Sequence, residues 1–122
     1  MKRILLAEDE EVLRMLIVDI FENHDFLIDE AEDGQEALYY LKEHAYDLII
    51  LDYMMPLYTG FEVIEKVKLF EKNKNTKILM LSAKNQQNER EKVIKAGADH
   101  FMAKPFSPSQ LLETVEEILN EK

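Results

Sequence analysis

Four short polar segments of this sequence could contribute to one chemical site. They are Glu8-Asp9, Asp52, Ser82 and Lys104, and each comes directly after a short run of apolar residues. Carboxylates bind hard divalent cations, and an ionised aspartate can attack phosphorus to form an acyl phosphate. A lysine and a hydroxyl can stabilise the oxygens of the transferred group. These residue types therefore indicate metal-assisted transfer of a phosphoryl group to a carboxylate.

Five apolar runs predict the strands that would deliver these residues. The runs alternate with longer segments of helical period, which is typical of crossover units that build a mostly parallel sheet. We expect an α/β domain in which a doubly wound five-stranded parallel sheet, with strand order 2-1-3-4-5, is covered by five helices. The predicted strands are Arg3–Ala7, Phe26–Ala31, Leu48–Leu51, Lys77–Leu81 and Asp99–Ala103.

Three of the predicted helices have an ordinary amphipathic pattern. The first has an apolar stripe at helical spacing, with Glu10 and Glu11 at its positive end. The second covers Gln35–Glu43 and the third about Phe61–Lys72. The side chains expected to face the core are Leu13, Leu16, Ile17, Ile20 and Phe21 in the first helix, Leu38 and Leu41 in the second, and Val63, Val67 and Phe70 in the third.

The fourth predicted helix differs from the others because it has few apolar residues. It is polar from Asn85 to Lys92, and only Val93, Ile94 and Ala96 can reach the core before Gly97 ends it. We therefore expect it to be the most loosely held helix.

The start of the fifth helix is well marked. Ser107 can cap its first turn, Pro108 suits the first helical position, and Gln110 completes a capping box. An apolar stripe from Leu111 to Leu119 then gives the helix a buried face.

The predicted sheet would bring the acidic residues together. Ligands of such sheets bind beyond the carboxyl ends of the strands, where the winding direction reverses, and there the first and third strands are neighbours. Glu8, Asp9 and Asp52 should therefore lie close to one another. Two charges ~4 Å apart repel by roughly 4 kcal/mol at an effective dielectric of about 20, so this cluster needs a cation or shifted protonation. Mg²⁺, which prefers carboxylate, water and phosphate oxygens, answers that need. We predict Asp52 as the nucleophile, with Lys104 and Ser82 contacting the transferred phosphoryl group.

The composition limits the size of the protein and its partners. With 122 residues, 47% of them hydrophobic, we expect one domain over residues 1–122. The net charge of -10 argues against nucleic-acid binding by this domain. The sequence has no cysteine, which fits a reducing compartment, and no apolar run approaches the ~20 residues that cross a bilayer. We therefore expect a cytoplasmic location and no membrane contact.

Taken together, the motifs resemble those of response-regulator receiver domains of two-component signalling, of the chemotaxis type, over essentially the whole chain. This resemblance implies a flavodoxin-like fold. It also implies a signalling domain, not an enzyme, that receives a phosphoryl group from a histidine kinase or a histidine phosphotransferase. The matching segments are Leu5-Leu6-Ala7-Glu8-Asp9-Glu10, residues 47–56 with Gly60, Leu81-Ser82-Ala83, and Phe101-Met102-Ala103-Lys104-Pro105-Phe106.

The resemblance assigns roles to residues of the site. Asp52 is implied as the phosphoacceptor, Asp9 as a direct Mg²⁺ ligand and Glu8 as a ligand through water. The backbone carbonyl of Met54 is implied as a further metal ligand. Glu8 stands where many family members have aspartate, which changes the reach of this ligand. The Lys104-Pro105 peptide bond is expected to be cis, as in the family.

The resemblance also implies a switch. Ser82 and Phe101 are expected to move together on phosphorylation and to alter the face made by helix four, strand five and helix five. The expected partner downstream is an effector protein or domain, and a phosphorylation-dependent dimer is a further expectation. By this resemblance, Met54 and Lys84 occupy positions that in the family control water access to the acyl phosphate. Because neither is a carboxylate or an amide that could position water, we expect slow self-dephosphorylation.

Other functions fit the residues less well. The nearest alternative is a phosphorelay intermediate that passes its phosphoryl group to another histidine. A phosphatase of the haloacid dehalogenase type needs a second aspartate two residues after the nucleophile, where this sequence has Met54. A flavin or nucleotide carrier needs a phosphate-binding loop after the first strand, but Glu8-Asp9-Glu10-Glu11 would repel phosphate. A degenerate receiver that only binds proteins is disfavoured by the complete set of polar site residues.

Overall fold

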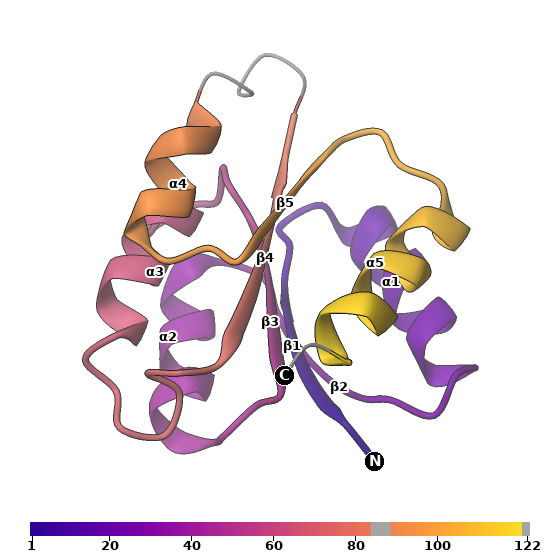
Figure 1. The fold of residues 1–122 in the computed structure, drawn as a ribbon, viewed down its shortest axis with the longest axis horizontal. Coiled ribbons are helices and arrows are strands. Elements are labelled where there is room, and N and C mark those ends of the chain that lie inside the picture. Colours follow the sequence, from indigo (N-terminus) through magenta and orange to yellow (C-terminus); the bar gives the residue numbers. More distant parts are fainter. Residues whose placement is uncertain (84–88, 121–122) are drawn as a thin grey trace.

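Strands and helices alternate strictly along the chain in the computed structural model, which describes residues 1–83 and 89–120 (Figure 1). The elements are β1 Arg3–Ala7, α1 Glu11–Glu22, β2 Leu27–Ala31, α2 Gly34–Glu43, β3 Leu48–Asp52, α3 Gly60–Val67, β4 Lys77–Ser82, α4 Arg90–Ala96, β5 His100–Ala103 and α5 Pro108–Leu119.

The strands form one parallel sheet in the order β2-β1-β3-β4-β5, which confirms the predicted fold and strand order. The predicted strand ends are off by one residue for β2 to β5. The register pairs Ala7 with Leu51 and Asp52 with Leu81. The chain therefore leaves β1, β3 and β4 at one edge of the sheet and at nearly the same level.

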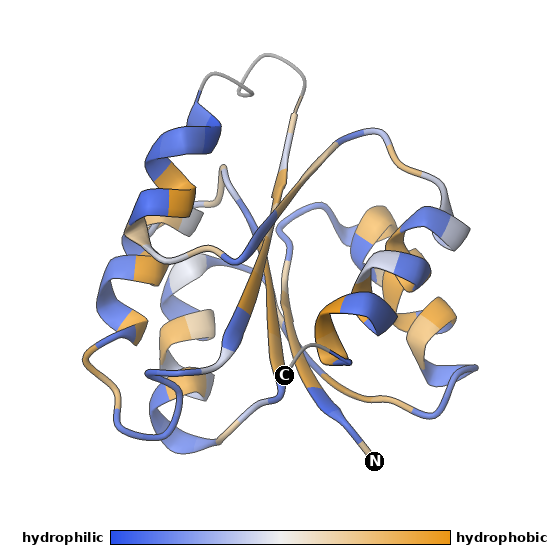
Figure 2. Ribbon diagram, in the orientation of Figure 1, coloured by the Kyte–Doolittle hydropathy of each residue, from blue (hydrophilic) through white to orange (hydrophobic). Residues whose placement is uncertain are grey.

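The helices form a layer on each face of the sheet. Figure 1 shows α2, α3 and α4 on one face and α1 and α5 on the other. Two separate clusters of buried hydrophobic side chains fill the spaces between the sheet and these layers. Figure 2 shows hydrophilic and hydrophobic residues alternating around the helices, as expected of helices with one buried face.

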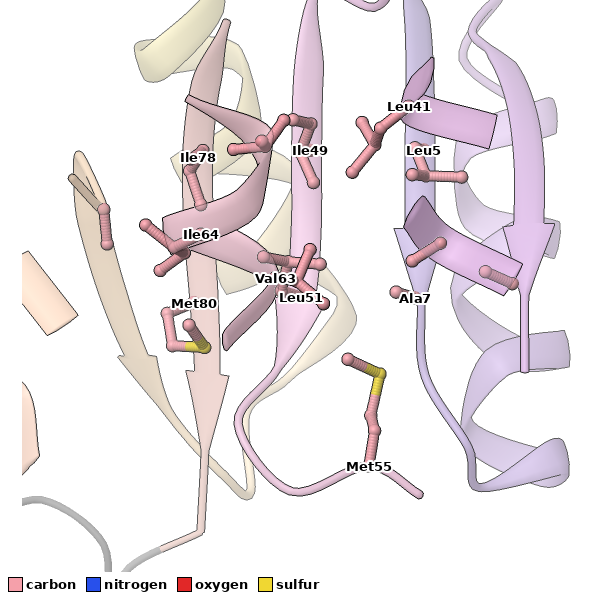
Figure 3. Close-up of a cluster of buried hydrophobic side chains, with 14 of the residues drawn as sticks. Leu5, Ala7, Leu41, Ile49, Leu51, Met55, Val63, Ile64, Ile78 and Met80 are labelled. Carbon is pink, nitrogen blue, oxygen red and sulfur yellow. The ribbon is translucent and has the colours of Figure 1, made fainter. Parts of the chain in front are cut away.

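The cluster beneath α2, α3 and α4 extends to the edge where the strands end. In Figure 3, Ile49 and Ile78 of the sheet lie near Leu41 and Ile64 of the helices, while Met55 lies at the strand ends below Ala7 and Leu51. Full burial of one such aliphatic side chain contributes about 1.5–3 kcal/mol. The strand ends are therefore supported by packed hydrophobic side chains and not by loops alone.

The third helix ends earlier than predicted. We expected it to reach Lys72, but α3 ends at Val67. Beyond that residue the backbone tightens into hydrogen bonds between residues three apart, from the amide of Leu69 to Lys66 and from that of Phe70 to Val67.

The buried side chain of Asn73 gives a reason for this early end. Its Nδ2 donates to the carbonyl oxygens of Leu41 and His44, each at 2.6 Å, and its Oδ1 accepts from the amide of Tyr46 at 2.9 Å. The chain has to leave the helical path to place Asn73 among these groups, which would otherwise be buried without partners.

The predicted apolar stripe of α1 is wrong at one position. Leu16 was expected in the core but is 49% exposed, whereas Arg14 is buried. Leu13 and Ile20 are partly buried, and Ile17 and Phe21 are fully buried as predicted. Arg14 can be buried because its guanidinium forms a hydrogen bond and ion pairs, as described below.

The two last helices agree with their predicted patterns where the structure describes them. In α4 the only fully buried residue is Val93, and Gly97 ends the helix with a φ of 129°. The predicted start of this helix at Asn85 lies outside the described residues. In α5, Ser107 and Gln110 form the capping box in both directions. Within the described part of the chain, no helix is long and apolar enough to cross a membrane.

Candidate functional site

The polar residues singled out in the sequence all lie at the carboxyl edge of the sheet. Glu8 and Asp9 follow β1, Asp52 ends β3, Ser82 ends β4 and Lys104 follows β5. Glu8 and Ser82 are fully buried, Asp52 is 6% exposed, and Asp9 is open to solvent. The arrangement has a buried floor and one exposed acidic side.

The three carboxylates lie as close together as predicted. One oxygen from each of Glu8, Asp9 and Asp52 lies within 4.8 Å of the others. Burial, followed by the charge of Glu8, raises the pKa of Asp52 to about 7, although Lys104 acts in the opposite direction. Three oxygen donors at this separation fit a hard divalent cation such as Mg²⁺, with room for water on the exposed side of Asp9.

Lys104 already supplies a positive charge in this cluster. Its Nζ lies 2.8 Å from Oε1 of Glu8 and 3.3 Å from Oδ1 of Asp52. Burial alone would lower the pKa of Lys104, but the hydrogen bond to Glu8 and the charges of Asp52 and Glu8 raise it overall. The lysine is therefore protonated at neutral pH. The Lys104-Pro105 peptide bond is cis, as predicted.

Backbone contacts at the end of β4 position Ser82 and Lys104 relative to Asp52. The amide of Lys104 donates to the carbonyl oxygen of Ser82 at 2.7 Å, which ties the segment after β5 to the end of β4. The Ser82 hydroxyl donates to the carbonyl oxygen of Ala83 at 3.2 Å. Since Asp52 pairs with Leu81 in the register, Ser82 stands one residue beyond the level of Asp52.

Glycine is required where the chain returns toward Asp52. A Cβ added at Gly60 would lie 2.5 Å from the backbone oxygen of Asp52 and 2.9 Å from the sulfur of Met80. Because real Cβ atoms do not approach other atoms so closely, the start of α3 can pack against the end of β3 only with glycine at this position.

Of the remaining predicted residues, Phe101 lies in β5 and Met54 follows the end of β3. Phe101 pairs with Met80 in the sheet, is partly buried, and has the guanidinium of Arg90 at 5.8 Å from its ring centroid. The side chain of Met54 is 53% exposed, and its carbonyl stays a predicted metal ligand. Lys84 lies outside the described residues.

Sequence reasoning missed one buried residue that contacts the site. The Nη1 of Arg14 donates to the backbone oxygen of Glu8 at 2.8 Å, and both groups are buried. The signal was available in the composition, because Arg14 is the only lysine or arginine between residues 8 and 36, a stretch that contains twelve acids.

The fold and the site together define a doubly wound α/β domain with an acidic, lysine-containing centre at the point where the sheet reverses its winding. Comparison with known families names the class more closely. The model of the response regulator receiver domain matches residues 4–116. The chain therefore belongs to the family of response regulator receiver domains of two-component systems.

Individual relatives agree with this assignment. The chain is 34% identical to the chemotaxis protein CheY of Halobacterium salinarum, with 97% of both chains covered. It is 39% identical to the transcriptional regulatory protein ResD of Bacillus subtilis, where the match covers 96% of this chain but 48% of the relative. The chain thus spans about half the length of that regulator.

Solved structures of the same fold are also similar. The chemotaxis protein CheY4 of Vibrio cholerae superposes with a TM-score of 0.90 at 30% identity, covering 97% of this chain and 98% of the other. The receiver domain of a sensor histidine kinase of Pseudomonas aeruginosa gives a TM-score of 0.89 at 25% identity, with 98% of both chains covered. That structure has a magnesium ion coordinated in its active-site cleft.

Proposed function

We propose that this chain is a phosphoacceptor domain in which Asp52 receives a phosphoryl group from a phosphohistidine of a partner protein. The observation that supports it most is the place of the Asp52 carboxylate, which lies 3.3 Å from a protonated lysine and within 4.8 Å of two more carboxylates. This combination gives one nucleophile, one cation for the phosphoryl oxygens and a set of metal donors. Family membership supports the same role.

The proposed transfer uses the residues of the site as follows. An ionised Oδ of Asp52 attacks phosphorus while the bond between phosphorus and the imidazole nitrogen breaks, and the leaving imidazole keeps the electron pair. Lys104 exchanges its contact with Asp52 for a phosphoryl oxygen, and the hydroxyl of Ser82 donates a hydrogen bond to another.

The carboxylates of Glu8, Asp9 and Asp52 and the carbonyl of Met54 would hold Mg²⁺. When bound, the ion supplies positive charge that neutralises the phosphoryl oxygens. The donor set supports this proposal, because three carboxylates at this separation carry more negative charge than the single positive charge of Lys104 balances. The magnesium ion in the related receiver structure supports it further.

The proposed partners are a histidine kinase or histidine phosphotransferase upstream and an effector protein or domain downstream. We infer that residues 1–122 act as one receiver domain and that α4, β5 and α5 form its output face. A groove of about 640 Å³ lies along β5 and α5 and has Phe101 in its wall, which supports the proposed link between this aromatic residue and an effector. Dimerisation after phosphorylation and onward transfer in a phosphorelay remain compatible with the same chemistry.

A direct test is to incubate the chain with acetyl phosphate and Mg²⁺ and to measure its intact mass. We expect a single phosphoryl adduct on the wild type and on Asp19→Ala, which removes an acid from the exposed side of α1. We expect none on Asp52→Ala and none in EDTA. An adduct that persists in Asp52→Ala would mean that the acceptor is wrongly assigned. Absence of any wild-type adduct would favour a binding module that works without phosphorylation.

A further inference from the structure

Arg14 is an unusual residue for the inner face of a helix. It is 7% exposed, although a guanidinium loses solvation on burial and needs close polar partners. It is also the only lysine or arginine in the acidic stretch 8–36. The groups that contact the Arg14 guanidinium should therefore explain why this cation is buried.

Two of the partners of Arg14, Glu30 and Glu32, do not explain its burial. Its Nε lies 3.3 Å from a carboxylate oxygen of Glu30, and its Nη2 lies 3.7 Å from one of Glu32. These carboxylate side chains are 45% and 68% exposed, so the ion pairs are screened by water and contribute little. The same pairs could form with a guanidinium at the surface.

The third partner is different because it is buried. The Nη1 of Arg14 donates to the backbone oxygen of Glu8 at 2.8 Å. This oxygen belongs to the peptide bond that joins Glu8 to Asp9, which are two of the three donors of the proposed metal site. Since a peptide unit is planar, holding its carbonyl fixes the directions in which both residues leave it.

Other contacts complete the restraint on this turn. The amide of Glu8 donates to the carbonyl oxygen of Ala31 at 3.1 Å, and the amide of Glu10 donates to the Glu8 carboxylate at 3.1 Å. Arg14 therefore supplies the one side-chain donor that holds the peptide plane between the two donors, in the part of the chain that the structure describes.

We propose that Arg14 is a positioning residue for a divalent cation: by holding the Glu8-Asp9 peptide, it sets the geometry with which these carboxylates bind Mg²⁺. The inference rests on the proposed function, since it assumes that the acidic cluster is a metal site. Groups that orient metal ligands typically change metal affinity about 10- to 100-fold when they are removed.

The test is a calorimetric titration of the whole chain with MgCl₂. Arg14→Met removes the donor and the charge but keeps an unbranched side chain to fill the buried space. Arg3→Met is the matched control, because Arg3 also pairs with a carboxylate of β2, at 2.8 Å from Asp29, but lies at the opposite edge of the sheet. We expect the dissociation constant for Mg²⁺ to be about 10- to 100-fold larger in Arg14→Met and unchanged in Arg3→Met.

Two further measurements separate positioning from general loss of structure. The rate of phosphorylation by acetyl phosphate in Arg14→Met should recover at saturating Mg²⁺, because only metal affinity is impaired. Arg14→Lys keeps the charge but not the planar fork of donors, so it should also bind Mg²⁺ more weakly and shift the backbone amide resonances of Asp9 and Glu10. This variant keeps the test decisive if Arg14→Met does not fold.

The outcomes distinguish the two proposals. Equal Mg²⁺ affinity in wild type, Arg14→Met and Arg14→Lys would overturn the role of Arg14 and leave the metal site in place. The same loss in Arg3→Met as in Arg14→Met would overturn it too, because net charge would then explain both. Failure of the wild type itself to bind Mg²⁺ would overturn the proposed metal site, and with it this inference.

Discussion

The ionisation of Asp52 makes the metal-free protein sensitive to pH. Its pKa is raised from 3.8 to about 7, mainly by burial and by the charge of Glu8. Between these values the folded state keeps a proton that the unfolded state has lost. The free energy of unfolding should therefore fall as pH rises from about 4 to about 7, and remain low above that range.

Urea unfolding in EDTA at a series of pH values tests this expectation. In the wild type the midpoint should fall across this range relative to Asp52→Asn, which cannot ionise at position 52. Parallel curves for the two proteins would show that Asp52 does not titrate as described. Mg²⁺ requires the ionised carboxylate, so its apparent affinity should rise over the same pH range.

The side chain at position 54 should affect the lifetime of the acyl phosphate. Met54 follows Asp52 by two positions, and its exposed thioether cannot hold a water molecule in place for attack on phosphorus. Met54→Asn introduces an amide at this position and should shorten the lifetime, whereas Met54→Leu should not. Decay of the phosphoryl adduct after removal of acetyl phosphate gives both rates. A longer lifetime in Met54→Asn would contradict this reasoning.

The residues of the site could be predicted from the sequence because acids, a serine and a lysine rarely all follow the strands of one sheet. Asp52 and Lys104 were expected at the same edge of the sheet, and they lie 3.3 Å apart. Arg14 was not foreseen, because the sequence marks it as the only lysine or arginine in the acidic stretch 8–36 but does not show which way its side chain points. Its position depends on a backbone carbonyl, which leaves no pattern in the side chains.

Among the helices, α4 has the weakest hold on the sheet in the part of the chain that the structure describes. Val93 is its only fully buried residue, whereas α3 buries Gly60, Val63, Ile64 and Val67. We expect amide hydrogen exchange to be faster in Arg90–Ala96 than in Gly60–Val67. We also expect a phosphoryl mimic such as beryllofluoride to change the exchange rates of α4 but not those of α3. Unchanged exchange in α4 would argue against its role in the output face.

Element boundaries were predicted less well than the elements themselves. Apolar runs placed all five strands and capping residues placed the start of α5, since both signals are local. The end of α3 depends instead on Asn73 reaching groups from Leu41 to Tyr46, and a contact so distant in sequence is not visible in local periodicity. The exposure of Leu16 has a similar cause, because Arg14 occupies the inner position.

For the whole molecule, metal binding should appear as stability. A ligand that binds only the folded state adds about 2.7 kcal/mol when it is present at about 100 times its dissociation constant. The melting temperature should therefore rise with Mg²⁺ in the wild type and fall again in EDTA. The effect should be stronger at low ionic strength, because the net charge of -10 attracts cations and salt screens this attraction. An equal rise in Asp52→Ala would indicate general cation binding.

Asn73 has a consequence for experiments that measure movement. It ties the turn before β3 to the turn before β4, at the edge of the sheet opposite to the polar centre. Pairs of spin labels could take one member from this turn region as a stationary reference. Any change of distance to a second label on α4 could then be attributed to α4 alone.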